Sequence, residues 1–333
     1  MRVLLTGGTG FLGRRLAEQL APRHDLVLLA RPTADRGGLP ASAEIVEGDV
    51  ADRESLARAA DGCAAIVHAA AVVKILAPAA ELDRVNLGGL DNVIDVAGGV
   101  DHVVYVSSFI ALGPTERLPG GVADESTEPV GPHGPRRRWI NGYERTKTLA
   151  DRRARRAIAE GAPLSIVYPG VVYGPGAMTE GNIVVRHLRD LARNRVPGLL
   201  GRPERRWNYA FVEDVAEGIR RVLENAAPGS RYCLGGENVS QELFYALVSE
   251  VGGIPVPTRR IPDGVARAAG LAAREWGRLT RRTPALTPDL VEIYRHDWAL
   301  SSARAESELA YQPRDLRRGL EDTIGWLRER RAW

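Results

Sequence analysis

A glycine-rich turn near the N-terminus constrains the fold of this 333-residue chain more than any other feature. The short apolar run of residues 2–6 leads directly into this turn, and a helix-compatible stretch follows it. Glycine lets the backbone turn sharply and approach a ligand, while the start of a helix offers N–H groups and a positive dipole. The order of strand, turn and helix therefore predicts a dinucleotide-binding turn. The residues expected to contact the dinucleotide are Gly7, Thr9, Gly10, Phe11, Leu12 and Gly13.

Short apolar segments then alternate with helical segments as far as residue 170. We expect further strands at 26–30, 45–47, 65–70, 103–107 and 164–167, with helices at 52–60, 82–97 and 143–160 between them. Such alternation is typical of a parallel sheet covered by helices on both faces. The predicted fold class is therefore α/β, a doubly wound parallel (Rossmann) sheet.

After Gly176 the strict alternation weakens, and we expect a second, smaller lobe. Residues 209–236 are predicted to return to the main sheet, so the dinucleotide-binding domain comprises 1–170 plus 209–236. The discontinuous C-terminal lobe, 171–208 plus 237–333, is predicted to bind the substrate. Residues 113–140 are rich in glycine, proline and charged residues, and we expect them to form a loop across the top of the sheet. A loop of this length inside a compact domain is usually functional.

Composition argues against several other classes of protein. The 45 basic residues are interspersed with 42 acidic ones, and the net charge is only +3, so a nucleic-acid partner is not expected. Cys63 and Cys233 are expected to be buried free thiols, and no metal site is predicted. No apolar run reaches the roughly 18 residues of a membrane span. Because the chain begins directly on a strand, we expect no signal peptide and a cytoplasmic protein.

The end of the second predicted strand bears on the choice of cofactor. A carboxylate there binds the ribose hydroxyls of NAD, whereas an arginine accommodates the 2′-phosphate of NADP. The segment has no acid but does have Arg31, which favours NADP(H) over NAD(H), although a simple surface arginine is the alternative. Asp49 is expected to accept a hydrogen bond from the adenine amino group, and the alternative role of capping the next helix is compatible with this. Further expected cofactor contacts are Val50 and the small residues Ala69, Ala70 and Ala71.

Three side chains predict acid–base chemistry beside the nicotinamide. Tyr143 and Lys147 are four residues apart and so share one helix face. The lysine ammonium is expected to lower the pKa of the phenol from its ordinary value of about 10. One hydroxyl of the pair Ser107 and Ser108, at the end of the fifth strand, is expected to bind the substrate oxygen.

In this order the motifs resemble the extended short-chain dehydrogenase/reductase superfamily, which includes epimerases, dehydratases and dihydroflavonol-4-reductase-like enzymes. The resemblance implies that Ser108 rather than Ser107 is catalytic, and that Pro169, Gly170 and Val171 pack near the nicotinamide, where Tyr143 and Lys147 also contact the cofactor. Many relatives have arginine where this chain has Tyr168. The matching blocks are residues 6–13, 48–50, 68–71, 85–86, 105–108, 143–147, 168–176 and 209–218.

The resulting hypothesis is hydride transfer between NADP(H) and a secondary alcohol or ketone of a mainly apolar small molecule, flavonoid-, isoprenoid- or steroid-like. Met178 and Asn182 are the expected substrate contacts, with Trp207, Trp276 and the loop 113–140 as further candidates to line the pocket. One alternative is a nucleotide-sugar epimerase or dehydratase that holds NAD tightly, and a more remote one is a non-catalytic NADP sensor. The family resemblance also implies a possible homodimer.

Overall fold

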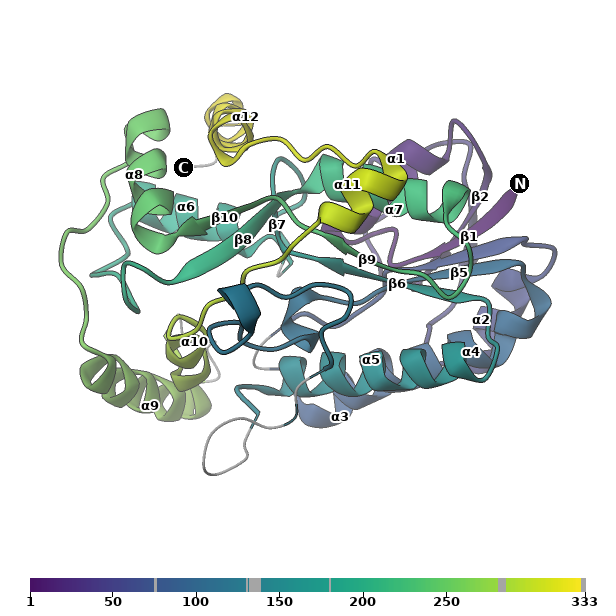
Figure 1. Cartoon of the computed structure of the whole chain (residues 1–333), viewed down its shortest axis with the longest axis horizontal. Coiled ribbons are helices and arrows are strands. Elements are labelled where there is room, and N and C mark those ends of the chain that lie inside the picture. The colour runs from purple at the N-terminus through teal and green to yellow at the C-terminus, as the bar shows by residue number, and fades with distance from the viewer. Residues whose placement is uncertain (75–76, 130, 132–138, 180, 281–285, 331–333) are drawn as a thin grey trace.

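The computed structural model describes residues 1–74, 77–129, 131, 139–179, 181–280 and 286–330. Within these residues the main sheet has seven parallel strands in the order β3-β2-β1-β4-β5-β6-β9 (Figure 1). The strands are β1 (Arg2–Thr6), β2 (Asp25–Ala30), β3 (Glu44–Glu47), β4 (Ala65–His68), β5 (His102–Val106), β6 (Leu164–Pro169) and β9 (Arg231–Leu234). The predicted Rossmann fold is confirmed.

Helices cover both faces of this sheet, as Figure 1 shows. Side chains alternate between the faces along each strand, so Val3 and Leu5 pack in one apolar cluster and Leu4 in the other. One face carries α1 (Phe11–Leu20), α7 (Val212–Asn225) and α11 (Ala303–Leu309), and the other carries α2 (Arg53–Ala60), α4 (Gly89–Val96) and α5 (Gly142–Ala159). Both faces are therefore buried, which explains why the strands are apolar along their whole length.

The predicted helix at 82–97 is interrupted. Its first part is α3 (Ala79–Leu82), followed by a π-helical turn over Asp83–Gly88 and then by α4. Such π turns occur frequently at functional sites. This one carries Asn86, whose amide bonds both backbone groups of Val72 and the hydroxyl of Thr146, and so joins the segment after β4 to α5.

A smaller sheet, β10-β8-β7, forms the centre of the second lobe. Its strands are β7 (Val171–Tyr173), β8 (Arg206–Phe211) and β10 (Glu237–Ser240), and the rings of Tyr209 and Phe244 stack at 4.5 Å in its core. The remaining helices are α6 (Ile183–Ala192), α8 (Gln241–Gly252), α9 (Asp263–Thr280), α10 (Pro288–Ile293) and α12 (Leu316–Glu329). None of the helices in the described residues is long and apolar enough to cross a membrane.

Some elements lie on the other side of the expected lobe boundaries. β8 belongs to the smaller sheet up to Phe211, while α7 and β9 belong to the main domain. Near the C-terminus, α11 packs on α7 and β9, so the chain returns to the main domain once more. The division of the chain into two lobes at the expected residues stays a prediction.

Candidate active site

The glycine turn is held in place by close backbone packing. Gly7 has a positive φ of 78°, and a Cβ atom on it would lie 2.6 Å from the backbone nitrogen of Ala70. A Cβ on Gly13 would lie 1.9 Å from the carbonyl oxygen of Gly7. Gly7 and Gly13 therefore allow the tight turn between β1 and α1. At Gly10 a Cβ would meet only the oxygen of Gly7, at 3.2 Å, which leaves its outer side open to a ligand.

The N-terminus of α1 is suited to an anion. Gly10 is its N-cap, no side chain of the described residues caps it, and its first turn has no acidic residue. The backbone N–H groups of the first turn, Phe11 to Gly13, are therefore available to a phosphate group, which the positive end of the helix dipole also attracts. Thr9 precedes this helical turn and Leu12 lies within it, and both are half-buried. These residues fit the dinucleotide that the sequence predicts.

Contacts between neighbouring strand ends connect the glycine turn with the predicted catalytic residues. The Thr6 hydroxyl lies 2.8 Å from Nδ1 of His68, and the amide of Ala69 donates to the carbonyl of Thr6. The His68 ring stacks on Tyr105, and the Lys147 ammonium lies 5.3 Å from the centre of the Tyr105 ring. Burial and the charge of Lys147 lower the pKa of His68 to about 3, so this histidine is neutral and cannot act as an acid.

Arg31 and Asp49 lie at adjacent strand ends, after β2 and β3. The Arg31 side chain is exposed and makes no hydrogen bond or ion pair within the described part of the chain. Burial opposes ionisation of Asp49, but hydrogen bonds from Ala51 and Arg84 hold its pKa below the ordinary value. Asp52, not Asp49, caps α2 by accepting from the amide of Glu54, so the alternative of a capping role for Asp49 is wrong.

Capping sets the position of Tyr143 in the first turn of α5. The side chain of Asn141 accepts from the amide of Glu144, and the Glu144 carboxylate accepts from the amide of Ile140 at 2.6 Å. These reciprocal bonds fix the start of the helix. Tyr143 packs against the apolar cluster that includes Val171, and Phe109, next to Ser108, packs there as well.

The sequence predicts a lowered pKa for Tyr143, but the structure has the opposite shift. Burial raises the pKa of Tyr143 to about 12, and a hydrogen bond with the Ser108 side chain opposes that shift in part. Among the described residues the Lys147 ammonium has no hydrogen bond with this phenol and donates instead to the carbonyl of Val106 at 3.0 Å. Tyr143 is therefore protonated at neutral pH, as a proton donor must be.

Lys147 belongs to a buried polar row on α5 that sequence reasoning missed. Asp151, one turn further, is fully buried and accepts from Nε of Arg155 at 2.7 Å. Arg155 in turn donates to the phenol oxygen of Tyr168 at 3.0 Å. Burial lowers the pKa of Lys147 to about 8, while the charge of Asp151 opposes this shift. The Lys-Asp-Arg spacing of four residues was the available signal.

This row also explains Tyr168, which stands where many relatives have arginine. Tyr168 is buried in β6, and the guanidinium beside it comes from Arg155 on α5. Tyr168 therefore packs in the core between β6 and α5.

The segment that joins the two sheets is tightly packed. Pro169 ends β6, Val171 begins β7, and a Cβ on Gly170 would lie 2.2 Å from Oδ1 of Asn208. Val171 is 4% exposed. The backbone is therefore rigid where the family resemblance implies the nicotinamide.

The expected substrate residues are scattered. Asn182 is fully buried and donates to the carbonyl of Gly174, whereas Met178 is 36% exposed. Trp207 is buried beside Tyr209 and Tyr294. Trp276 is 67% exposed on α9, which disagrees with its expected place in the lining of a pocket. In the loop 113–140, residues 130 and 132–138 lie outside the described residues. The described part of this loop makes backbone hydrogen bonds with residues 297–301 through Thr115 and Ala123.

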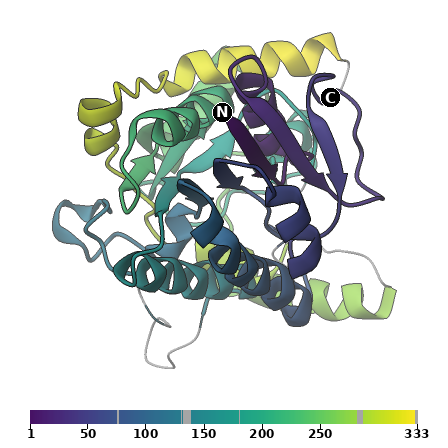
Figure 2. The same cartoon turned by 90° about the vertical axis from the view of Figure 1, so that its right-hand side faces the viewer.

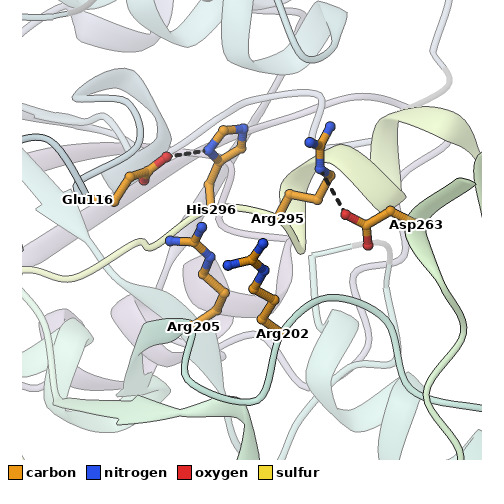
Figure 3. Close-up of a pocket in the computed structure, with 6 residues that line it drawn as sticks. All are labelled: Glu116, Arg202, Arg205, Asp263, Arg295 and His296. Atoms are coloured by element: carbon orange, nitrogen blue, oxygen red, sulfur yellow. Dashed lines mark hydrogen bonds and ion pairs between the residues drawn. The ribbon is translucent and has the colours of Figure 1, made fainter.

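A polar pocket lies where this loop meets the C-terminal part of the chain (Figure 3). It is lined by Glu116, Arg202, Arg205, Asp263, Arg295 and His296. Nδ1 of His296 lies 2.6 Å from the Glu116 carboxylate, and Arg295 pairs with Asp263 at 3.1 Å. Its lining includes none of the predicted catalytic side chains and is charged, unlike the predicted apolar site.

The ion pair between His296 and Glu116 makes stability depend on pH. Burial alone lowers the pKa of His296, but the carboxylates of Glu116 and Glu292 raise it to about 9 from 6.5. A raised pKa stabilises the fold fully below the ordinary value, and this stabilisation is lost as the pH rises from 6.5 through 9. We expect the free energy of unfolding, measured in urea across this range, to fall by about 1 kcal/mol more in the wild type than in His296→Gln. If the free energy of unfolding changed with pH in the same way in both proteins, the raised pKa of His296 would be contradicted.

Comparisons with known proteins agree with this geometry. The model of the NAD dependent epimerase/dehydratase family matches residues 3–235. The chain is 29% identical to sterol demethylase protein B of Methylococcus capsulatus, with 99% of each chain covered. It is 28% identical to a 3 beta-hydroxysteroid dehydrogenase/Delta 5→4-isomerase of Mycobacterium tuberculosis, covering 94% of this chain and 86% of that relative.

Among solved structures, a dTDP-glucose 4,6-dehydratase from Streptomyces venezuelae with NAD bound has a TM-score of 0.78 at 23% identity. The match covers 100% of this chain and 98% of the dehydratase, and it shows that the fold is shared. The matched residues contain the glycine turn, Ser108, Tyr143 and Lys147. The chain therefore belongs to the NAD dependent epimerase/dehydratase family and is an enzyme of the extended short-chain dehydrogenase/reductase type.

Proposed function

We propose that this enzyme transfers hydride reversibly between NADP(H) and a secondary alcohol or ketone of a mainly apolar small molecule. The observation that carries the proposal is the pairing of Tyr143 with Ser108 at the end of β5, with Lys147 one helical turn away. The uncapped glycine turn, two strands away in the same sheet, fits a dinucleotide. Together these groups supply what a carbonyl reduction requires: a hydride source, a proton donor and a hydrogen bond to the oxygen.

Tyr143 acts as the proton donor in the direction of reduction. Its pKa of about 12 keeps the phenol protonated at neutral pH. A nicotinamide bound here would supply hydride to the carbonyl carbon, and Tyr143 would give its proton to the carbonyl oxygen. Ser108 donates a hydrogen bond to that same oxygen and orients it. In the direction of oxidation the proton returns to Tyr143.

Lys147 contributes a positive charge behind the phenol. Its ammonium is buried against the Tyr105 ring and is bonded to the Val106 carbonyl at the end of β5. Since its pKa is about 8, it is mostly protonated at neutral pH. We propose that it turns from Val106 toward the nicotinamide ribose when the cofactor binds, and that its charge then favours the phenolate that forms when Tyr143 gives up its proton.

Two features support NADP(H) and an apolar substrate. The guanidinium of Arg31 is exposed and without a partner in the described residues, so it is available to a 2′-phosphate. The names of the sterol demethylase and hydroxysteroid dehydrogenase relatives point to polycyclic alcohols and ketones.

Replacing Arg31 by aspartate is expected to raise KM for NADPH at least about tenfold, because the 2′-phosphate loses a charge-assisted contact. KM for NADH is expected to stay the same or fall. Steady-state kinetics with both cofactors measure the change. The matched control is Arg58→Asp, which makes the same change in charge at an exposed arginine elsewhere, on α2. If Arg31→Asp changed KM for NADPH and KM for NADH by the same factor, the proposal that Arg31 binds the 2′-phosphate would be contradicted.

The proposed function is tested by screening the purified protein against ketones, aldehydes and alcohols with NADP(H) and NAD(H) in parallel. We expect reduced NADPH to be consumed in step with an apolar ketone. Turnover of nucleotide sugars alone, without added nicotinamide, would replace the proposal by the epimerase or dehydratase alternative.

A further inference from the structure

Lysine is rare in this chain, so the lysine on α5 is informative. Only two lysines, Lys74 and Lys147, occur among the 45 basic residues. A lysine ammonium is compact and can lose its proton, whereas an arginine guanidinium is broad and stays charged. Lys147 is 3% exposed, and its one hydrogen bond within the described residues goes to the carbonyl of Val106. Burial of this kind favours the neutral amine, so a nearby negative charge is required to keep the ammonium.

The groups around this ammonium differ in the charge that they can carry. Those that face it in the described part of the chain are His68 of β4, Tyr105 of β5, and Tyr143 and Asp151 of α5. His68 is neutral, because burial lowers its pKa to about 3. Burial raises the pKa of both phenols above the ordinary value, so Tyr105 and Tyr143 are neutral as well. Asp151 is therefore the member of this set that can supply a negative charge.

Asp151 lies one helical turn beyond Lys147, on the same face of α5. Residues four apart on a helix have Cβ atoms about 5–6 Å apart. Figures 1 and 2 show α5 along one face of the main sheet, and Asp151 is fully buried there. Its Oδ2 accepts from Nε of Arg155 at 2.7 Å, whereas Oδ1 has no hydrogen-bond partner among the described residues. One carboxylate oxygen thus remains available to the ammonium.

Arg155 favours the ionised form of this carboxylate. Burial raises the pKa of Asp151, and the positive charges of Arg155 and Arg231 oppose that shift. The guanidinium of Arg155 also donates to the carbonyl of Thr127 at 2.9 Å and to the phenol oxygen of Tyr168 at 3.0 Å. These two bonds hold Arg155 in place independently of Asp151. A neutral side chain at position 151 therefore leaves Arg155 with partners, and we expect the fold to tolerate it.

We propose that Asp151 is a positioning residue, one that holds the Lys147 ammonium in its charged form behind Tyr143. Because Asp151 is fully buried, it acts through Lys147 and not by touching a substrate. The effect on turnover rests on the proposed function, in which the charge of Lys147 favours the phenolate of Tyr143. The link between Asp151 and Lys147 itself exists with or without a substrate.

The test is NMR titration of the full chain labelled with ¹³C at the lysine Cε, because two lysines give two signals. Lys74 is exposed and serves as the internal reference. In the wild type the Lys147 signal should titrate with a pKa of about 8. In Asp151→Asn its midpoint should fall by at least about one pH unit, a tenfold loss of proton affinity, since a nearby opposite charge is removed.

Two further variants separate charge from packing. Asp91→Asn is the matched control, because Asp91 pairs with Arg153 on the exposed side of the same helix. It should leave the Lys147 midpoint as in the wild type. Asp151→Ser is smaller but equally uncharged, so it should shift the midpoint as Asp151→Asn does, and it takes the place of that variant if circular dichroism shows Asp151→Asn to be unfolded. An unchanged Lys147 midpoint in the uncharged variants would overturn the proposal.

A second readout is the pH dependence of kcat with NADPH and an accepted ketone. The wild-type rate should fall as the pH rises through about 8, where Lys147 loses its proton. In Asp151→Asn this fall should lie at least about one pH unit lower, so the rate is about fivefold below the wild type at pH 8 but nearly equal to it at about pH 6. A rate lowered by the same factor at every pH would overturn the proposal. If the NMR midpoint shifts but the wild type turns over no ketone, the proposed function fails while the role of Asp151 stands.

Discussion

Tyr143→Phe is expected to lower kcat by about 10²–10⁴-fold, the usual contribution of a positioned proton donor. The ring keeps its packing, so cofactor affinity should stay within about twofold of the wild type, as the removed hydroxyl is not part of the glycine turn. Stopped-flow or steady-state turnover with an accepted ketone gives the rate, and titration of the cofactor gives the affinity.

Tyr105→Phe is the matched control for that change. Tyr105 is also buried, and its hydroxyl has no hydrogen-bond partner among the described residues. Phenylalanine keeps the ring beneath the Lys147 ammonium. Near-normal turnover is therefore expected. If Tyr143→Phe were as active as Tyr105→Phe, Tyr143 could not be the proton donor.

Gly13→Ala is expected to have the second large effect. The new methyl group would lie 1.9 Å from the carbonyl oxygen of Gly7, so the backbone of the turn must move. The N–H groups at the start of α1 then no longer meet the pyrophosphate. We expect the affinity for NADPH to fall by about 100-fold or more and the free energy of unfolding to fall by about 1–3 kcal/mol. Calorimetric titration and urea unfolding measure the two quantities.

The same substitution at Gly325 is the control. A Cβ there meets nothing within 4 Å, and the residue lies inside α12. Alanine is better than glycine inside a helix by about 1 kcal/mol, so Gly325→Ala should stabilise the protein slightly and leave cofactor binding unchanged. Equal cofactor affinity in Gly13→Ala and Gly325→Ala would show that the turn does not bind the cofactor in the way described.

Much of the main domain could be predicted from local patterns. The bounds of β1 match the expected residues and those of α5 differ by one residue at each end, because apolar strands and capped helices are encoded within a few neighbouring residues. The glycine turn could be predicted for the same reason. By contrast, whether Asp49 or Asp52 caps α2 depends on the backbone path between them, and both have suitable side chains.

The second lobe was harder to predict, since its structure depends on contacts between distant segments. α9, α10, α11 and α12 were not assigned, because proline and arginine interrupt the apolar pattern there. Trp276 was a candidate to line the substrate pocket, yet Ala266 and Gly270 form the packed face of α9 and Trp276 is 67% exposed. The pairing of His296 with Glu116 joins residues 180 positions apart, which no local pattern reveals.

The pKa of Tyr143 likewise depends on packing that no local sequence pattern reveals. Spacing alone places Lys147 one turn from the phenol, but the Val106 carbonyl takes up the ammonium in this structure, and burial dominates the shift. The catalytic roles of Ser108, Tyr143 and Lys147 stay predictions, and the balance of burial and charge around them could only come from packing.

Hydride transfer is tested most directly with NADPH deuterated at the transferable position and an apolar ketone accepted by the enzyme. The account predicts one deuterium on the carbinol carbon of the alcohol product, measured by mass spectrometry, in amounts equal to the NADPH oxidised. Alcohol formed without deuterium at that carbon, or NADPH oxidised without alcohol product, would contradict it.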